Sequence, residues 1–209
     1  MVIFLTISPS CTNLDEEPFS QIPVDQFGET EAQINSLVAP IYLGLRDVFA
    51  SYYCAICEVT SDMAVVPTRR GGDWYDDGVW KELRTHSWTP LNVHVTSVYN
   101  LIMSHISECN LIYYKISTSN ATEKGRLLAE IRGVRAYWYY TLIDLWGNVP
   151  IVTNTELSKP ETKTREEVFD FIINELNEIK DSVRSDITTS SYGKMTRGAV
   201  YTMLAKMYL

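Results

Sequence analysis

The sequence has no long apolar run, few basic residues and no basic cluster. None of its apolar stretches reaches the roughly 18 residues that a helix needs to span a bilayer. The 18 lysines and arginines are outnumbered by 26 acidic residues, so the net charge is −8, and the largest basic cluster is the pair Arg69 and Arg70. Such a chain is poorly suited to bind a phosphate backbone, and we expect no nucleic acid among its partners.

Metal-site and catalytic signatures are missing too. The three histidines form no H-E-x-x-H motif, and His94 and His105 would lie about 16 Å apart along one helix. The sequence has no G-x-S-x-G motif, no phosphate-binding loop and no dinucleotide fingerprint. Carboxylates such as Asp76 and Asp77 could form the acid pair of a glycosidase, but solvated acids are far more common. We therefore expect no metal ion, no cofactor and no enzymatic activity.

Cysteine is scarce, with four residues in the chain. Cys54 and Cys57 form a C-x-x-C motif, which in other settings is a redox pair or half of a zinc site. No βαβ pattern surrounds this motif, and the sequence has no second pair of the same spacing. We interpret both residues as incidental or structural thiols.

The strongest feature present is an apolar and aromatic segment at residues 126–152, RLLAEIRGVRAYWYYTLIDLWGNVPIV. Apolar residues recur at steps of three and four, as on one face of an α-helix, at Leu127, Ile131, Val134, Trp138, Leu142 and Leu145. The opposite face is apolar as well, at Leu128, Tyr137, Tyr139, Tyr140 and Ile143. Because a monomer seldom exposes so many large side chains, we expect this helix to lie between neighbouring helices. Gly147 and Pro150 should end it.

Apolar periodicity predicts two helices before the central one and two after it. Their expected ranges are 30–49, 93–116, 164–179 and 196–209. The N-caps expected for the first, the central and the last two helices are Thr30, Thr122, Thr164 and Thr196. Pro40 should kink the first helix, and Glu167 should complete a capping box with its N-cap threonine.

Between Phe49 and Leu91 no period persists, which predicts a long irregular loop inserted between helices. Its centre, residues 68–80, reads TRRGGDWYDDGVW and combines charges, glycines and three aromatic rings. Aromatic faces stack on the apolar faces of sugars, while Asp and Arg bond sugar hydroxyls. The alternative is that the rings pack together as a small core beneath the loop. The candidate ligand-binding residues are Asp62, Arg69, Asp73, Trp74, Tyr75 and Trp80.

Three segments, in this order, resemble the SusD/RagB family of bacterial nutrient-binding lipoproteins. The family's central aromatic helix and its Gly-Asp-Val-Pro-like turn resemble RGVRAYWYYTLIDLWGNVPIV, where Asn148 replaces the commoner Asp. Its next two helices resemble TREEVFDFIINELNEI and GKMTRGAVYTMLAKMYL, at residues 164–179 and 193–209. The resemblance extends from Cys11 to Leu209. It implies an all-α fold, a TPR-like helical repeat scaffold with a long irregular loop insertion, truncated relative to a family whose members are several hundred residues long.

The truncation has an expected structural consequence. The last helix reaches Leu209 without a Gly, an Asn or a polar stop. We expect the side formed by Val200, Leu204 and Tyr208 to lack a packing partner and to promote aggregation.

The N-terminus, MVIFLTISPSC, is similar to the end of a lipoprotein signal. The usual basic start is absent, and Ser8 and Pro9 depart from the usual lipobox. With the family resemblance, we interpret residues 1–11 as the remnant of a lipoprotein signal that ends at the lipidation residue Cys11. Residues 12–209 would be the N-terminal part of a single SusD-like helical domain. The alternative is an ordinary apolar N-terminus.

The resemblance also implies a function. Family members are surface-exposed glycan- or nutrient-binding lipoproteins, lipid-anchored in the outer membrane, that act with a SusC-like TonB-dependent transporter in oligosaccharide uptake. In this interpretation Arg132, Arg135 and Trp146 have structural roles. Two alternatives remain, a TPR-like protein–protein adaptor without a small-molecule ligand and an all-α hydrolase. Titration with oligosaccharides separates the first two, and release of sugar from a substrate would be required for the third.

Overall fold

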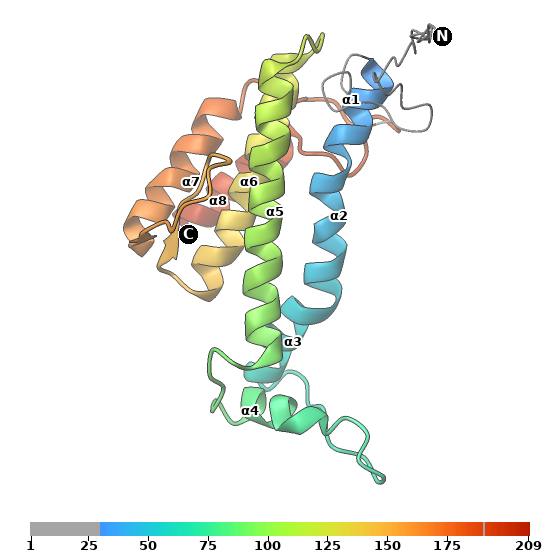
Figure 1. The fold of residues 1–209 in the computed structure, drawn as a ribbon, viewed down its shortest axis with the longest axis vertical. Helices are drawn as coiled ribbons and strands as arrows, with labels where there is room; N and C mark the ends of the chain where they lie inside the picture. The colour runs from blue at the N-terminus through green and yellow to red at the C-terminus, as the bar shows by residue number, and fades with distance from the viewer. Residues whose placement is uncertain (1–29, 190) are drawn as a thin grey trace, which may run out of the picture.

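A computed structural model of the chain describes residues 30–189 and 191–209, which are mostly helical (Figure 1). The α-helices are α1 (Glu31–Val38), α2 (Pro40–Asp47), α3 (Cys54–Thr60), α4 (Val79–Arg84), α5 (Val93–Thr118), α6 (Lys124–Leu145), α7 (Arg165–Ile179) and α8 (Arg197–Tyr208). A π-helix, η1 (Val48–Tyr53), joins α2 to α3, and a 3-10 turn, η2 (Asp76–Gly78), precedes α4. Two short antiparallel strands, β1 (Val149–Pro150) and β2 (Thr162–Lys163), lie between α6 and α7. In the described part of the chain, no helix is both long and apolar enough to cross a membrane.

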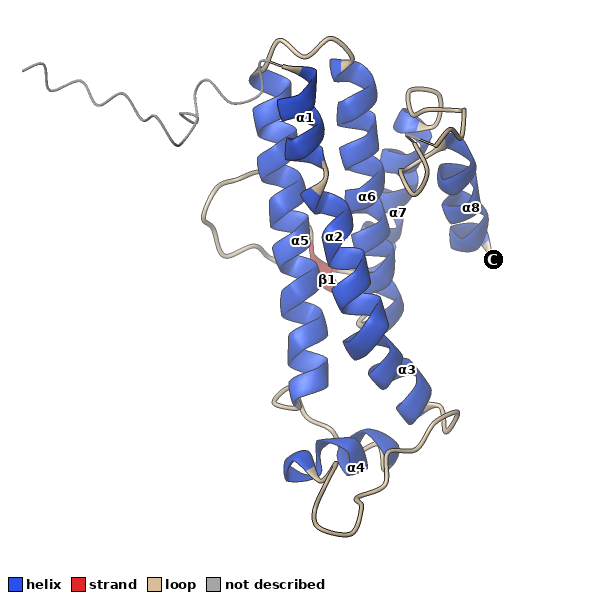
Figure 2. Cartoon of the chain, turned by 90° about the vertical axis from the view of Figure 1, so that its right-hand side faces the viewer, coloured by secondary structure: helices blue, strands red, loops and turns tan. Residues whose placement is uncertain are grey.

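The helices are arranged around α6. Helix α5 packs along one side of α6 and α7 packs along another, while α1, α2 and η1 run beside α5 (Figure 2). Gly44 brings α2 close to α5, because a Cβ at that position would overlap the His105 ring. Helix α8 packs against α7. This stacked, all-helical arrangement is the fold expected from the sequence.

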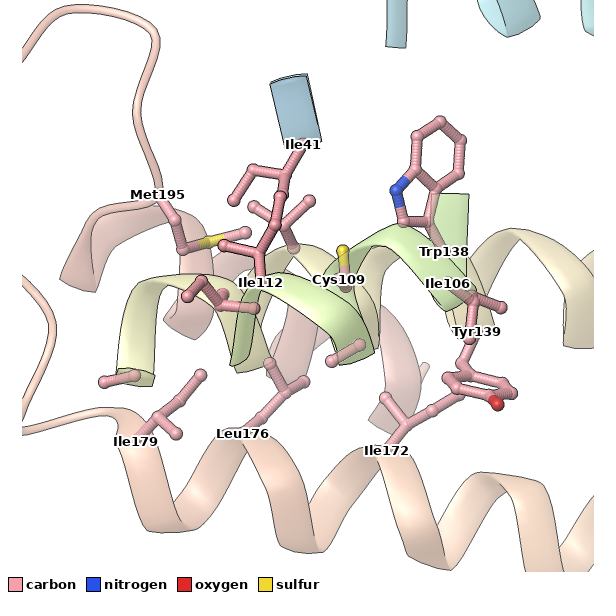
Figure 3. Close-up of a cluster of buried hydrophobic side chains, with 14 of the residues drawn as sticks. Ile41, Ile106, Cys109, Ile112, Trp138, Tyr139, Ile172, Leu176, Ile179 and Met195 are labelled. Carbon is pink, nitrogen blue, oxygen red and sulfur yellow. The ribbon is translucent and has the colours of Figure 1, made fainter. Parts of the chain in front are cut away.

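The hydrophobic core lies on both sides of α6 (Figure 3). Trp138 and Tyr139 are completely buried, although they are consecutive and point to different sides of the helix. The Trp138 ring stacks on His105 of α5 with ring centroids 5.1 Å apart, whereas Tyr139 meets Phe171 of α7 edge-on at 5.0 Å. The other core side chains drawn around them include Ile41, Ile106, Cys109, Ile112, Ile172, Leu176, Ile179 and Met195. The predicted sandwiching of this helix is confirmed.

Local capping also follows the sequence at three of the four expected positions. The side-chain oxygens of Thr30, Thr164 and Thr196 each accept a hydrogen bond from a backbone N–H in the first turn of the following helix. Glu167 completes the capping box at the start of α7. The helix is interrupted at Ala39, between α1 and α2 and directly before Pro40, as expected for a proline.

Thr122 is not the N-cap of the central helix. Helix α6 begins at Lys124, and the preceding Glu123 makes no side-chain capping hydrogen bond. The expectation for α8 was also wrong in part. Val200 and Leu204 are buried within the chain, while Tyr208 is 67% exposed and its ring meets Phe169 in a T-shaped contact. The side of α8 that carries its apolar residues therefore has partners inside this structure.

The region 49–91 contains more helix than the sequence indicated. The first helical segment continues through η1 into α3 and ends at Thr60, and α4 interrupts the remaining loop. The hydrogen bonds of a π-helix link residues five apart, so the apolar side chains leave the 3.6-residue period at this point. That local change of period concealed the continuation. The irregular loop is correspondingly shorter than predicted.

A buried polar cluster fixes the segment that follows α6. Arg135, which is 4% exposed, donates hydrogen bonds to Glu175 of α7 at 2.8 Å and to Asn110 of α5 at 2.8 Å. Asn110 in turn donates to the carbonyl oxygens of Val152 and Asn154, at 2.9 and 3.2 Å. Arg132 also pairs with Glu175, at 2.7 Å. Both arginines thus join neighbouring helices, which agrees with the structural role implied by the resemblance.

Candidate functional site

The candidate site is built on the loop that leaves α3 and returns through η2 to α4, at the lower end of the molecule in Figure 1. The loop is closed by backbone hydrogen bonds, including one from the N–H of Arg69 to the carbonyl of Asp73 at 2.8 Å. Gly71 and Gly72 lie between these residues with φ values of 101° and 94°. Because side chains other than glycine seldom adopt such values, the glycine pair makes this tight turn possible.

The three predicted aromatic residues of the loop lie around one small cavity. Trp74, Tyr75 and Trp80 line a hollow of about 250 Å³ together with Lys81 and Arg84 of α4. Trp74 is 46% exposed and Tyr75 is 56% exposed. Rings with this exposure are not a closed core beneath the loop. They present apolar faces to solvent, beside polar and cationic side chains.

The three charged candidate residues, Arg69, Asp62 and Asp73, lie at different places relative to the cavity. The Arg69 guanidinium lies over the Trp74 ring, 5.9 Å from its centroid, in a cation–π arrangement. Asp62 does not line the cavity itself. It forms an ion pair at 3.1 Å with Arg84, which does. Asp73 contributes its backbone carbonyl to the turn, and its side chain is not part of the cavity wall.

Trp80 is held in place by contacts with two other residues. Its indole Nε1 donates a hydrogen bond to the Asp76 carboxylate at 2.7 Å, and its ring packs on His94 with centroids 4.2 Å apart. His94 is 8% exposed, and burial lowers its pKa below the ordinary value of 6.5, an effect that the nearby Asp76 carboxylate partly offsets. The neutral imidazole is therefore favoured, and Trp80 lies against an uncharged ring.

Several residues in the wall of this cavity could not be identified from the sequence. Lys81 and Arg84 were not singled out, because helix α4 itself was not expected. Val65, Val66, Pro67 and Thr68 form the rest of the wall, with Gly78. His94 was assigned to a helix but not to the site. Its contact with Trp80 joins residues from two separate elements, and no sequence periodicity signals such a contact.

Other chemistry that the sequence raised is absent from this site. Across residues 30–189 and 191–209, no three His, Cys, Asp or Glu side chains are grouped as the ligands of a metal ion would be. Cys54 and Cys57 lie on α3 as free thiols, and burial raises the pKa of Cys57 above its usual range. A thiol with a raised pKa is a poor nucleophile near neutral pH.

A larger groove lies elsewhere, between α2, η1, α6 and α8. Its volume is about 880 Å³, and its wall includes the rings of Tyr42, Phe49, Tyr53, Tyr137 and Tyr140. The charged side chains in this wall are Arg46, Lys194 and Lys206, all of them basic. The half-buried tyrosines of α6 thus face this groove, while Trp138 and Tyr139 face the core.

Comparison with known proteins gives this arrangement a context. Residues 13–209 match a family of SusD-like proteins described as starch-binding and associating with the outer membrane. The starch-binding protein SusD of Bacteroides thetaiotaomicron is 27% identical over 136 residues, which are 65% of this chain and 24% of that protein. A SusD-like protein of Bacteroides ovatus is 26% identical over 207 residues, covering 94% of this chain and 35% of that protein.

Solved structures show the same fold. A laminarin-binding SusD-like protein superposes with a TM-score of 0.76 at 18% identity, over 86% of this chain and 40% of that one. Surface glycan-binding protein A from Bacteroides thetaiotaomicron, in complex with laminarihexaose, gives a TM-score of 0.68 at 18% identity, over 85% of this chain and 38% of that one.

The chain spans about a quarter to about two fifths of the length of these relatives. The family match runs from residue 13 to residue 209, so it includes the loop, the cavity and every described helix. The chain therefore belongs to the SusD-like family of starch-binding proteins that associate with the outer membrane.

Proposed function

We propose that this chain is the N-terminal part of a surface-exposed glycan-binding lipoprotein, which binds an oligosaccharide and passes it to a SusC-like TonB-dependent transporter. Residues 12–209 would form one part of a single SusD-like domain. The protein acts by binding and has no catalytic step of its own. The family membership supports the glycan class, and the relatives named for starch and laminarin make glucose oligosaccharides the first ligands to test.

One observation carries the location of the site. Two exposed aromatic rings, Trp74 and Tyr75, stand beside the cavity that Trp80, Lys81 and Arg84 also line. An exposed ring of this kind can stack on the apolar face of a sugar, and the Arg and Lys donors can bond its hydroxyl groups. In this proposal Arg69 and Asp62 hold the site in shape, through Trp74 and Arg84 respectively.

Replacing Trp74 with alanine should weaken oligosaccharide binding about ten- to a hundredfold, because one stacking surface is lost. Folding should be nearly unchanged, since the ring is about half exposed. Isothermal titration of the wild type and the variant with malto- and laminari-oligosaccharides measures the change. Trp88→Ala is the matched control, because Trp88 is 40% exposed but does not line the cavity. Unchanged affinity in the Trp74 variant would place the sugar elsewhere.

The lipid anchor is a separate part of the proposal. Cys11 lies outside the residues that the structure describes, and the sequence pattern and the family description support its role. A Cys11→Ser substitution in the full-length gene should move the protein from the membrane fraction to the soluble fraction of cells, as measured by immunoblotting. Full retention in the membrane fraction would contradict acylation at this residue, whatever the result of the sugar titrations.

A second candidate function is favoured by the groove between α2, α6 and α8. A helical repeat can bind another protein through an aromatic groove of this kind, and the three basic wall residues fit an acidic amphipathic helix. Oligosaccharide titration separates the two functions. A chain that binds no sugar, but binds an acidic amphipathic peptide in a salt-dependent manner, would be an adaptor.

A further inference from the structure

A second hollow lies between the end of α2, η1 and the first turns of α5. Its volume is about 570 Å³, and its wall includes Asp47, Tyr52, Ser97, Asn100 and Leu101. None of these residues was identified as a candidate from the sequence. None lines the cavity beside Trp74, Tyr75 and Trp80, which we call the loop cavity. The wall combines one aromatic ring and one aliphatic side chain with a carboxylate, a hydroxyl and an amide.

The polar side chains of this hollow have no partner within the described residues. Serine and asparagine side chains elsewhere on α5 do form hydrogen bonds: Ser107 donates to the Met103 carbonyl at 3.0 Å, and Asn110 donates to two carbonyl oxygens. In contrast, Asp47, Ser97 and Asn100 form no side-chain hydrogen bond or ion pair to any described residue. Their hydrogen-bonding groups therefore face water, which the hydroxyl groups of a ligand can replace.

A row of aromatic rings connects this hollow with the loop cavity. Trp74 lies 6.1 Å from Trp80, Trp80 lies 4.2 Å from His94, and His94 lies 6.0 Å from Tyr52, measured between ring centroids. The first ring of the row lines the loop cavity and the last lines the second hollow. The two hollows therefore lie at opposite ends of a row of four rings, of which His94 is buried.

One nitrogen at the buried centre of this row lacks a hydrogen bond. The Nδ1 atom of His94 is buried and has no hydrogen-bond partner in the described structure. A buried polar atom without a partner is costly, so packing against Trp80 and Tyr52 holds this ring in place.

The π-helix determines which way Tyr52 faces. Tyr52 and Tyr53 are consecutive in η1, yet Tyr52 lines this hollow and Tyr53 lines the groove beside α8. An uninterrupted α-helix from α2 to α3 would carry these rings at different angles, because its period is shorter than that of a π-helix. Short π-helical segments are frequent at functional sites.

We propose that the hollow between α2, η1 and α5 is a second glycan subsite, and that the ligand is an extended, hydroxyl-rich oligosaccharide that reaches both hollows. This inference rests on the proposed glycan-binding function. Trp74 and Tyr75 would bind one part of the chain, and Tyr52, Ser97 and Asn100 would bind another. Disaccharides would occupy the loop cavity alone.

The experiment compares ligand length. Isothermal titration of the whole chain with malto- and laminari-oligosaccharides, from disaccharide to hexasaccharide, should show affinity that rises with length. The double variant Ser97→Ala/Asn100→Ala should bind the hexasaccharide about tenfold more weakly and the disaccharide as tightly as the wild type does. Both changes favour helix formation, so α5 should remain folded. Ser104→Ala, an exposed position on the same helix outside the hollow, is the matched control.

The outcomes separate the inference from the function on which it rests. If the wild type binds sugar and Trp74→Ala weakens that binding, while the double variant binds every length like the wild type, the second subsite is refuted and the proposed function stands. Equal weakening for all lengths in the double variant would also refute a separate subsite. If the wild type binds no oligosaccharide of either series, both the function and the subsite fail.

Discussion

Replacing Trp138 with alanine is expected to lower the free energy of unfolding by about 3 to 5 kcal/mol. The ring is completely buried and stacks with both His105 of α5 and Phe49 of η1, with centroid distances of 5.1 and 6.1 Å. Its removal would open a cavity where three elements meet. Neighbours in a close-packed core relax only in part, so the lost contacts are not recovered. Urea denaturation followed by far-UV circular dichroism measures the change.

Trp74→Ala is the control for this measurement, because it removes the same atoms from a ring that is 46% exposed. The control should cost less than about 1 kcal/mol. The two variants therefore test opposite roles for the same residue type, one in the core and one at the candidate sugar site. A loss below about 1 kcal/mol for Trp138→Ala would contradict the placement of α6 in the centre of the fold.

Much of the scaffold could be predicted because its signals are local. The capping box of Thr164 and Glu167 lies within one turn of helix, so four residues are enough to identify it. The two-sided apolar pattern of α6 requires neighbours on more than one side, whatever those neighbours are. Both features depend on the identity of nearby residues alone, and both are present in the structure.

Other features depend on contacts between distant residues, and sequence patterns do not contain them. The π-helix η1 interrupts the helical period after Val48, so the helical continuation to Thr60 was not recognised. Ser97 and Asn100 look like ordinary polar residues on a helix surface, and only the fold brings them beside Tyr52. The candidate loop was found because its aromatic residues are clustered in the sequence. The second hollow was not found, because its residues come from three elements.

The buried arginine cluster allows an equally strong test. Glu175→Gln keeps the shape of the side chain but removes the charge that faces Arg132 and Arg135, at 2.7 and 2.8 Å. Arg135 is 4% exposed and would remain as a buried cation without its counter-ion. Loss of one partner from a buried pair costs about 3 to 5 kcal/mol, and denaturation with urea at neutral pH measures it.

Glu178→Gln is the matched control, since the Glu178 carboxylate also pairs with Arg132, at 2.5 Å, but its side chain is 64% exposed. Solvent screens an exposed pair, so this variant should lose less than about 1 kcal/mol. Equal effects of the two substitutions would mean that burial does not determine the strength of this cluster. The control also keeps the same net charge as the test variant, so a general change of charge cannot explain a difference between them.

The same cluster predicts how stability depends on pH. Burial raises the pKa of Glu175, but the hydrogen bonds and charges of Arg132 and Arg135 outweigh it, so the pKa lies below the ordinary value of 4.5. The unfolded chain therefore takes up this proton at a higher pH than the folded chain does. The contribution to stability is complete above about pH 4.5 and is lost as the pH falls through the lower, folded pKa. Glu175→Gln should lack this part of the acid-induced loss, so its unfolding free energy should approach that of the wild type as the pH falls towards 3. A constant difference between the two proteins across this pH range would contradict the assignment of a depressed pKa to Glu175.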